Sequence, residues 1–249
     1  NGFPKYPKAG VDIDYYLPNG YEGSVILEIL NAKGQIIQSL ASDSLENSNI
    51  LLEDMGLNLE YLLVEKELAA EAGMHRYRWN MRQRGPWDTR DNRRYKNGPL
   101  VAPGSYTVRL RTGNKVVEQK LELQLDPRLA ETGISTADVI AQTQLQGQVM
   151  TLLSETRLAA AEWAKELQQL NNQDRLKSKE VKRQVILEQL MAEMQSEADV
   201  IYAQPMLVDQ IRYLFFMLNG ADQRPGQDAY NRYDALVKQW TDLQAKVGQ

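Results

Sequence analysis

The hydrophobic pattern changes its period near the middle of this chain of 249 residues. Up to residue 127, short stretches alternate apolar and polar side chains, as in VDIDYYL at 11–17, and a period of two is typical of half-buried β-strands. From residue 135, apolar side chains recur three and four positions apart, which is the spacing of one helix face. The sequence therefore predicts a multidomain α+β protein, with an all-β domain followed by a helical one.

Residues 1–127 are predicted to form an immunoglobulin-like antiparallel β-sandwich. SVILEIL and GQIIQSL flank the turn sequence NAKG and should pair as a hairpin, and HRYRWNM, GSYTVRLRT and VVEQKLELQL supply further strands. Six or seven short strands separated by turns are typical of such sandwiches. Two segments interrupt them: an insertion at 41–72, where LNLEYLLVEKELAAEAG is expected to be helical, and a long loop at 83–103.

Residues 128–134 are predicted to be a hinge, and residues 135–249 an antiparallel bundle of about four helices. Ser135 begins the first helix with a capping-box pattern. A second helix should run to Ile201, ahead of Pro205, which disfavours helical geometry in the residue before it. The stretch MLVDQIRYLFFML is apolar on most faces, so this third helix should lie deepest. Large aromatic side chains lie on the apolar stripes of both halves and are expected in the cores: Trp79, Trp163 and Trp240.

Composition limits the chemistry open to this chain. The absence of cysteine excludes disulfides and thiolate ligands, and a net charge of −4 with a pI near 5.3 argues against a nucleic-acid partner. No apolar run approaches the roughly 18 residues of a membrane-spanning helix, so no membrane insertion is expected. Because the chain starts at Asn1 without a methionine or a leader pattern, we expect a processed product or a piece of a longer protein.

Catalytic candidates are few. His75 is the single histidine and lacks sequence partners, so neither a metal site nor a cofactor is expected, and a position at a strand edge is favoured. A glycosidase needs a pair of carboxylates, and the sequence offers Asp12 with Asp14 and Glu53 with Asp54. The first pair is what strand alternation alone would give, and the second lacks an aromatic cradle. We therefore predict that this chain is not itself an enzyme.

The loop at 83–103 combines cationic and aromatic side chains. Arginine binds carboxylates and phosphates with a planar fork, and aromatic rings stack on sugars or bases. The favoured interpretation is a solvated or interdomain loop, docked on the acidic insertion. If the loop binds a ligand, six residues are the candidate binding residues: Arg84, Trp87, Arg90, Arg93, Arg94 and Tyr95.

Three stretches of the chain resemble a known family. VILEILNAKGQIIQSL, GMHRYRWNMR and GPLVAPGSYTVRLRTGNKVVEQKLELQLDPR resemble the immunoglobulin-like module that follows the β-propeller in bacterial sortilin-like (VPS10/BNR-repeat) proteins, often labelled glycosyl hydrolases. The tail LVDQIRYLFFMLNGADQRPGQDAYNRYDALVKQW is similar to the helical segment that ends those proteins. No propeller repeat occurs in this sequence, so the hydrolase label does not transfer to these residues.

The resemblance implies a C-terminal scaffold or interaction region of a larger exported protein. It places the chain outside the bacterial cytoplasm, in the periplasm, on the cell surface or secreted. The implied partner is the β-propeller of the same parent protein or another envelope protein. Two other functions stay open: a carbohydrate-binding module acting through the loop with its arginines, Trp87 and Tyr95, and a glycoside hydrolase with its site between the domains.

Overall fold

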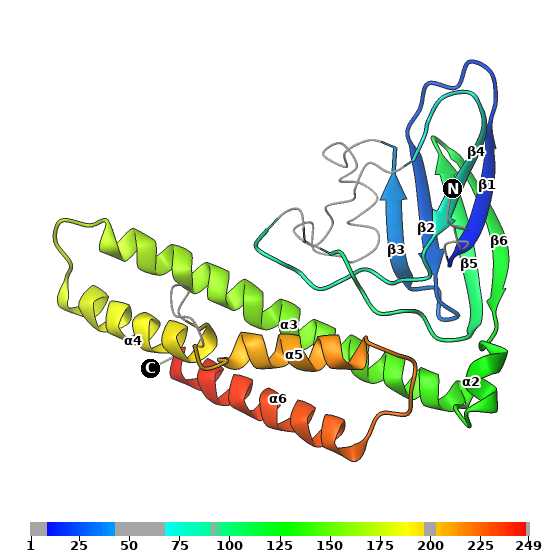
Figure 1. The fold of residues 1–249 in the computed structure, drawn as a ribbon. Helices are drawn as coiled ribbons and strands as arrows, with labels where there is room; N and C mark the ends of the chain where they lie inside the picture. Colours follow the sequence, from blue (N-terminus) through cyan, green and yellow to red (C-terminus); the bar gives the residue numbers. More distant parts are fainter. Residues whose placement is uncertain (1–8, 43–67, 91–92, 94, 197–202, 248–249) are drawn as a thin grey trace, which may run out of the picture. The chain divides into compact units, whose positions relative to one another are not determined.

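The chain forms a mixed α+β structure that divides into two compact units (Figure 1). The computed structural model describes residues 9–42, 68–90, 93, 95–196 and 203–247. Within these residues, six strands form two antiparallel sheets, and five helices follow them. The strand unit comprises Asn1–Arg84 and Leu100–Leu125, and the helical unit comprises Gly85–Pro99 and Asp126–Gln249.

The strand unit contains a two-stranded and a four-stranded sheet, ordered β1-β4 and β3-β2-β5-β6. Their strands are β1 (Val11–Leu17), β2 (Val25–Leu30), β3 (Ile36–Ala41), β4 (Gly73–Trp79), β5 (Gly104–Thr112) and β6 (Lys115–Leu123). The predicted hairpin is confirmed, because β2 pairs antiparallel with β3 across a turn that Gly34 closes with a φ of 75°. Glycine suits this position since side chains disfavour positive φ.

Side chains from both sheets form the core of the strand unit. Leu17 of β1 clusters with Val25 and Leu27 of β2, and all six residues of β2 are buried. Trp79 is fully buried, as predicted, and its Nε1 donates to the Arg82 carbonyl at 2.9 Å. Met81 was expected to continue the strand face of Trp79, but β4 ends at Trp79 and Met81 has a φ of 58°.

The four-stranded sheet also buries one carboxylate. Glu28 on β2 is 2% exposed and lies 3.0 Å from Arg111 and 3.4 Å from Arg109, both on β5. Arg109 is shared with Glu118 of β6 at 2.7 Å. Two cations therefore compensate the charge of Glu28 inside the sheet.

The helical unit contains α2 (Pro127–Glu131), α3 (Thr136–Asn171), α4 (Ser178–Met194), α5 (Leu207–Leu218) and α6 (Gln227–Val247). The predicted capping box is confirmed, because the Ser135 hydroxyl accepts from the Asp138 N–H and the Asp138 carboxylate accepts from the Ser135 N–H. The segment predicted as a hinge, 128–134, begins inside α2, which ends at Glu131. Asp126 caps α2 by accepting from the Arg128 N–H at 2.9 Å, which starts a helix where a linker was expected.

One hydrophobic core joins the four longer helices, and α3 contacts α4, α5 and α6 (Figure 1). Trp163 of α3 and Trp240 of α6 are both buried, as predicted, with ring centroids 6.0 Å apart. The prediction that the third helix lies deepest holds for one face only. Leu207, Val208, Ile211, Leu214, Phe215 and Leu218 are buried, whereas the opposite face of α5 exposes Tyr213, Phe216 and Met217.

Two buried glutamines fix the connection between α5 and α6. The Gln142 amide nitrogen donates to the carbonyls of Leu218 and Ala221, both at 2.6 Å, and its oxygen accepts from the Gln223 N–H at 2.8 Å. Gln146, one turn later on α3, also donates to the Leu218 carbonyl. The carbonyl groups at the end of α5, which lack helical partners, are thus satisfied by side chains of α3.

Some predictions fall outside the described residues. These are most of the helix expected in the insertion, the Glu53–Asp54 pair, Arg94, and the end of the second helix at Ile201. The described part of that helix ends earlier, at Met194, because Gln195 is extended with φ −133° and ψ 139°.

Candidate functional site

A buried tryptophan anchors the segment 85–99 to the helical unit. Trp87 is 7% exposed. Its backbone N–H donates to the Ser154 hydroxyl on α3, and its backbone carbonyl accepts from the Arg157 guanidinium, both at 3.0 Å. Ser154 in turn donates to the Met150 carbonyl of its own helix. Sequence analysis assigned this segment to the sandwich, whereas here it belongs to the helical unit.

The two arms of the segment bond to each other above this anchor. The Gly85 N–H donates to the Tyr95 carbonyl at 2.7 Å, and the Tyr95 N–H donates to the Pro86 carbonyl at 3.0 Å. A side chain at position 85 would place its Cβ 1.9 Å from the Lys96 carbonyl oxygen, so only glycine fits there. These bonds close the segment, and we call its described residues, 85–90, 93 and 95–99, the anchored loop.

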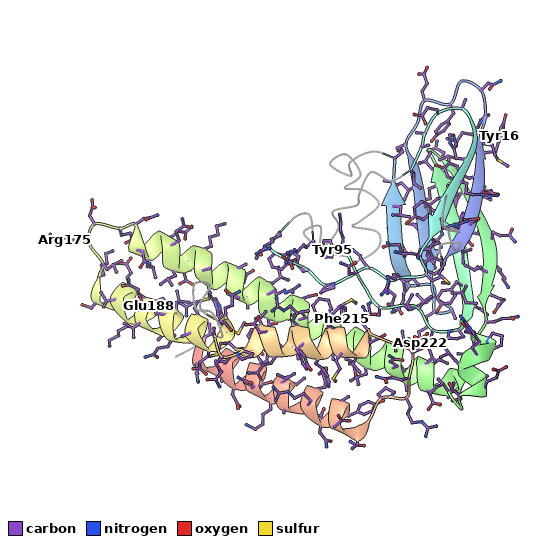
Figure 2. The ribbon with its side chains drawn as sticks, in the orientation of Figure 1. Tyr16, Tyr95, Arg175, Glu188, Phe215 and Asp222 are labelled. Carbon is purple, nitrogen blue, oxygen red and sulfur yellow. The ribbon has the colours of Figure 1, made fainter. Side chains whose placement is uncertain are left out.

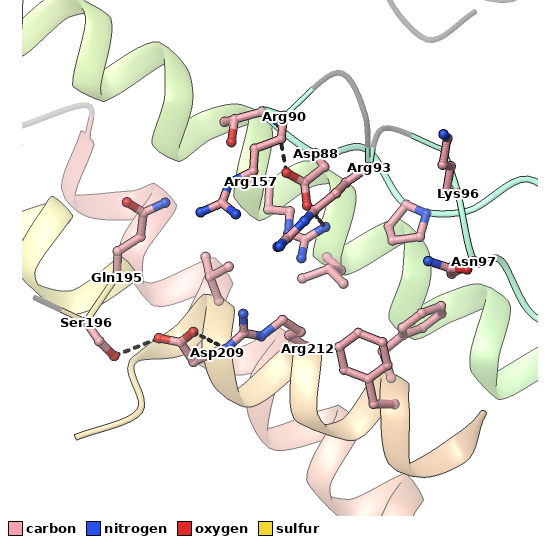
Figure 3. A pocket seen from close by; sticks show the side chains of 16 residues that line it. Asp88, Arg90, Arg93, Lys96, Asn97, Arg157, Gln195, Ser196, Asp209 and Arg212 are labelled. Atoms are coloured by element: carbon pink, nitrogen blue, oxygen red, sulfur yellow. Dashed lines mark hydrogen bonds and ion pairs between the residues drawn. The ribbon is translucent and has the colours of Figure 1, made fainter. Parts of the chain in front are cut away.

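A cavity of about 510 Å³ lies between the anchored loop and the helices (Figure 3). Asp88, Arg90, Arg93 and Arg157 lie on one side of it, and Ser196, Asp209 and Arg212 lie on the opposite side. Its floor is apolar and is formed by Leu153, Val208, Phe215 and Phe216. The volume lies in the range of small-molecule sites, and the combination of an apolar floor with polar walls is typical of such sites.

The cavity concentrates positive charge on an otherwise acidic chain. Among the described residues that line it, five are cationic and two are acidic: Arg90, Arg93, Lys96, Arg157 and Arg212 against Asp88 and Asp209. Because like charges confined in a cleft reinforce one another's potential, the surplus favours an anion in the cavity.

The surroundings of Arg157 in the cavity shift its pKa. Arg157 lies 3.2 Å from Asp88, and both side chains are 15% exposed. Burial lowers the pKa of Arg157, and the charges of Arg212 and Arg93 lower it further, although Asp88 and Asp209 oppose this. The Arg157 guanidinium stays protonated, so an added anion would relieve the repulsion.

The acidic residues of the cavity hold two of its cations in place. Asp209 pairs with Arg212 at 3.0 Å and accepts from the Ser196 hydroxyl at 2.7 Å, while Asp88 pairs with Arg157. Asp88 also accepts from the Arg90 N–H at 3.0 Å, which fixes the backbone of the loop. The side chains of Arg90 and Arg93 are exposed and form no ion pair with any described residue.

The structure separates the predicted binding residues into three groups. Arg90 and Arg93 line the cavity, while Trp87 and the half-buried Tyr95 build the anchored loop (Figure 2). Arg84 lies in the strand unit, where its N–H donates to the Ile37 carbonyl at 2.9 Å. Because Trp87 is only 7% exposed, it offers little surface on which a sugar could stack.

The helical half of the site was missed by sequence reasoning. Arg157, Gln195, Ser196 and Arg212 line the cavity, but each is a single polar residue within or beside an amphipathic helix. No motif marks them. They line one cavity together with residues of the anchored loop.

The catalytic candidates that the structure describes, Asp12, Asp14 and His75, lie in the strand unit and are engaged in other interactions. Asp12 and Asp14 on β1 pair with Arg78 and Arg76 on β4, at 2.5 and 2.6 Å, and hydrogen bonds from those arginines lower the pKa of both carboxyl groups. A general acid needs the opposite shift. His75 is half-buried, and its Nε2 lies 2.6 Å from the Glu71 carbonyl.

The described residues show neither a metal-binding cluster nor a membrane-spanning helix. Among them, no group of three or more His, Asp or Glu side chains could hold a metal ion. None of the described helices is long and apolar enough to cross a membrane.

Comparison with known proteins adds no assignment. No family model, no curated protein and no solved structure matches this chain. The resemblance to sortilin-like propeller proteins therefore stays a prediction.

Proposed function

We propose that this chain is a non-catalytic interaction region, the C-terminal part of a larger exported β-propeller protein of the sortilin-like type. In this proposal the strand unit is an immunoglobulin-like β-sandwich, and the helical unit is an antiparallel bundle of four long helices. The cores support this assignment, because side chains of both sheets share two clusters and the four longer helices share one.

The single observation that carries the proposal is the anchored loop above its cationic cavity. The backbone hydrogen bond of Trp87 and the close backbone approach at Gly85 hold the loop in place. The loop in turn places Arg90 and Arg93 at the cavity. Such an arrangement positions charged groups for binding. The partner is the propeller of the same parent or another envelope protein.

The size of the native product tests the link to a parent protein. Immunoblotting of envelope and secreted fractions with an antibody against this chain is expected to reveal a species far larger than 28.4 kDa. A native species of 28.4 kDa would overturn the assignment to a propeller protein. It would leave the binding role of the cavity to be tested by itself.

An activity assay tests the absence of catalysis. The purified chain is expected to release no product from chromogenic glycosides between pH 4 and pH 8, a range of about four units that spans the usual carboxyl pKa values of glycosidase sites. Hydrolysis that disappears in an Asp12→Asn or Asp14→Asn variant would identify a catalytic carboxylate and refute the proposal.

The carbohydrate-binding alternative is less well supported. It needs an exposed aromatic ring in the loop, whereas Trp87 is buried and Tyr95 is half-buried. A glycan array decides between the two functions: we expect no glycan to be retained. Retention that is lost in Arg93→Gln would favour the alternative.

A further inference from the structure

A second hollow lies beside the cationic cavity and differs from it in character. This apolar groove has a volume of about 830 Å³ and is lined chiefly by Pro205, Tyr213, Leu214, Met217 and Ala229. Tyr213 is 72% exposed and Met217 is 44% exposed, which is unusual for side chains of this size.

The cationic cavity and the apolar groove share one wall. Asp209, Arg212 and Phe216 line both hollows, and their spacing of three and four residues makes them one ridge along α5. The ridge is braced, since Arg212 pairs with Asp209 at 3.0 Å, and Phe216 contacts Phe215 with ring centroids 5.9 Å apart. Phe216 is nevertheless 56% exposed, so its outer face is open to a ligand.

We propose that the two hollows together bind one peptide segment of a partner protein, in which acidic residues stand next to bulky apolar ones. An acidic side chain enters the cavity between Arg90, Arg93 and Arg157, and an apolar side chain crosses Phe216 into the groove. Charge complementarity selects the acidic end, because the described walls of the cavity carry a surplus of three positive charges. The exposed apolar side chains of the groove favour the apolar part of the peptide.

The guanidinium groups at the site suit a carboxylate as the acidic group. Arg90 and Arg93 are exposed guanidiniums without an ion pair in the described structure, and guanidinium forks match carboxylates in geometry.

The inference rests on the proposed function as an interaction region, and peptide binding tests it directly. The probe is a fluorescein-labelled peptide of sequence Gly-Ser-Asp-Asp-Gly-Leu-Phe-Leu-Gly-Ser, followed by fluorescence anisotropy with the full chain. One comparison peptide replaces both aspartates by asparagine, and another replaces the apolar block by serine. Each is expected to bind about tenfold or more weakly than the probe.

Variants assign the two ends of the peptide to the two hollows. The double variant Arg90→Gln/Arg93→Gln is expected to weaken the probe about tenfold and to leave the asparagine peptide unchanged. Phe216→Ser is expected to weaken the probe about fivefold and to leave the serine peptide unchanged. Arg175→Gln and Tyr16→Ser are matched controls, since both side chains are exposed and lie outside the site.

Several results would overturn this inference. One is equal binding of the aspartate and asparagine peptides, and another is unchanged binding in the double variant. Tighter binding to vesicles of anionic phospholipid than to the peptide would assign the surface to a membrane instead. If the peptide does not bind, while the native species is large and no glycoside is hydrolysed, this inference alone is refuted. Hydrolysis of a glycoside would refute the proposed function.

Discussion

Gln142 should contribute more to the stability of the helical unit than any exposed residue of α3. Gln142→Leu keeps the approximate volume of the side chain but removes three hydrogen bonds, to Leu218, Ala221 and Gln223. A neutral hydrogen bond contributes about 0.5–1.5 kcal/mol, so three contribute about 1.5–4.5 kcal/mol. The Leu218 carbonyl keeps the bond from Gln146, and water can reach Ala221, which places the expected loss near 2–3 kcal/mol, roughly the middle of that range.

Urea unfolding followed by the helical circular-dichroism signal measures this loss as a lower midpoint at unchanged slope. Gln169→Leu is the matched control, because Gln169 is exposed on the same helix and a surface change there should stay within about 0.5 kcal/mol. The reasoning is refuted if Gln142→Leu is as stable as Gln169→Leu. The end of α5 would then be held by its apolar face alone.

Three further perturbations are expected to act locally. Trp87→Ala should remove about 3–5 kcal/mol of loop docking, seen as faster amide exchange at residues 85–90 with α6 unchanged; equal exchange would show that the ring is not the anchor. Arg224 and Ser135 hold the pKa of Asp138 well below its usual 3.8, so this carboxylate adds stability above about pH 4 that is lost as the pH falls. Asp138→Asn should therefore show a smaller drop in Tm between about pH 5 and pH 2 than the parent chain, and an identical drop would contradict the assignment. Glu28→Gln leaves Arg111 without its charge partner and should cost about 1–3 kcal/mol, read as faster exchange of β2 amides; a β2 exchange rate that does not change would mean solvent compensates Arg111.

Periodicity predicted the elements of this chain better than their ends. Alternation located β1, β5 and β6, and the three- and four-residue spacing located the four longer helices. The end of β4 was missed because Met81 is apolar and in phase with Trp79, yet its positive φ leaves the strand. Backbone conformation of this kind has no signal in hydrophobicity.

The site was half predictable from the sequence. Arg90 and Arg93 stood out because cationic residues cluster with aromatic ones in a long loop. Their partners Arg157 and Arg212 did not, because each occupies an ordinary polar position of an amphipathic helix. The sequence left two roles open for Trp87, a ligand-binding residue or part of a docked loop, and the structure shows that this residue is buried. A tryptophan in a polar loop has the same sequence signature in both cases.

The assignment of residues 85–99 to the helical unit has a consequence for how this region can be inherited. The chain passes from one unit to the other at residues 84–85, 99–100 and 125–126, so neither unit corresponds to one continuous stretch of gene. A recombination event that moved residues 126–249 alone would separate α3 from Trp87. Ser154 and Arg157 on α3 would then lose the hydrogen bonds that they form with the backbone of Trp87. We therefore expect the two units to be gained, lost and duplicated in evolution as a single block.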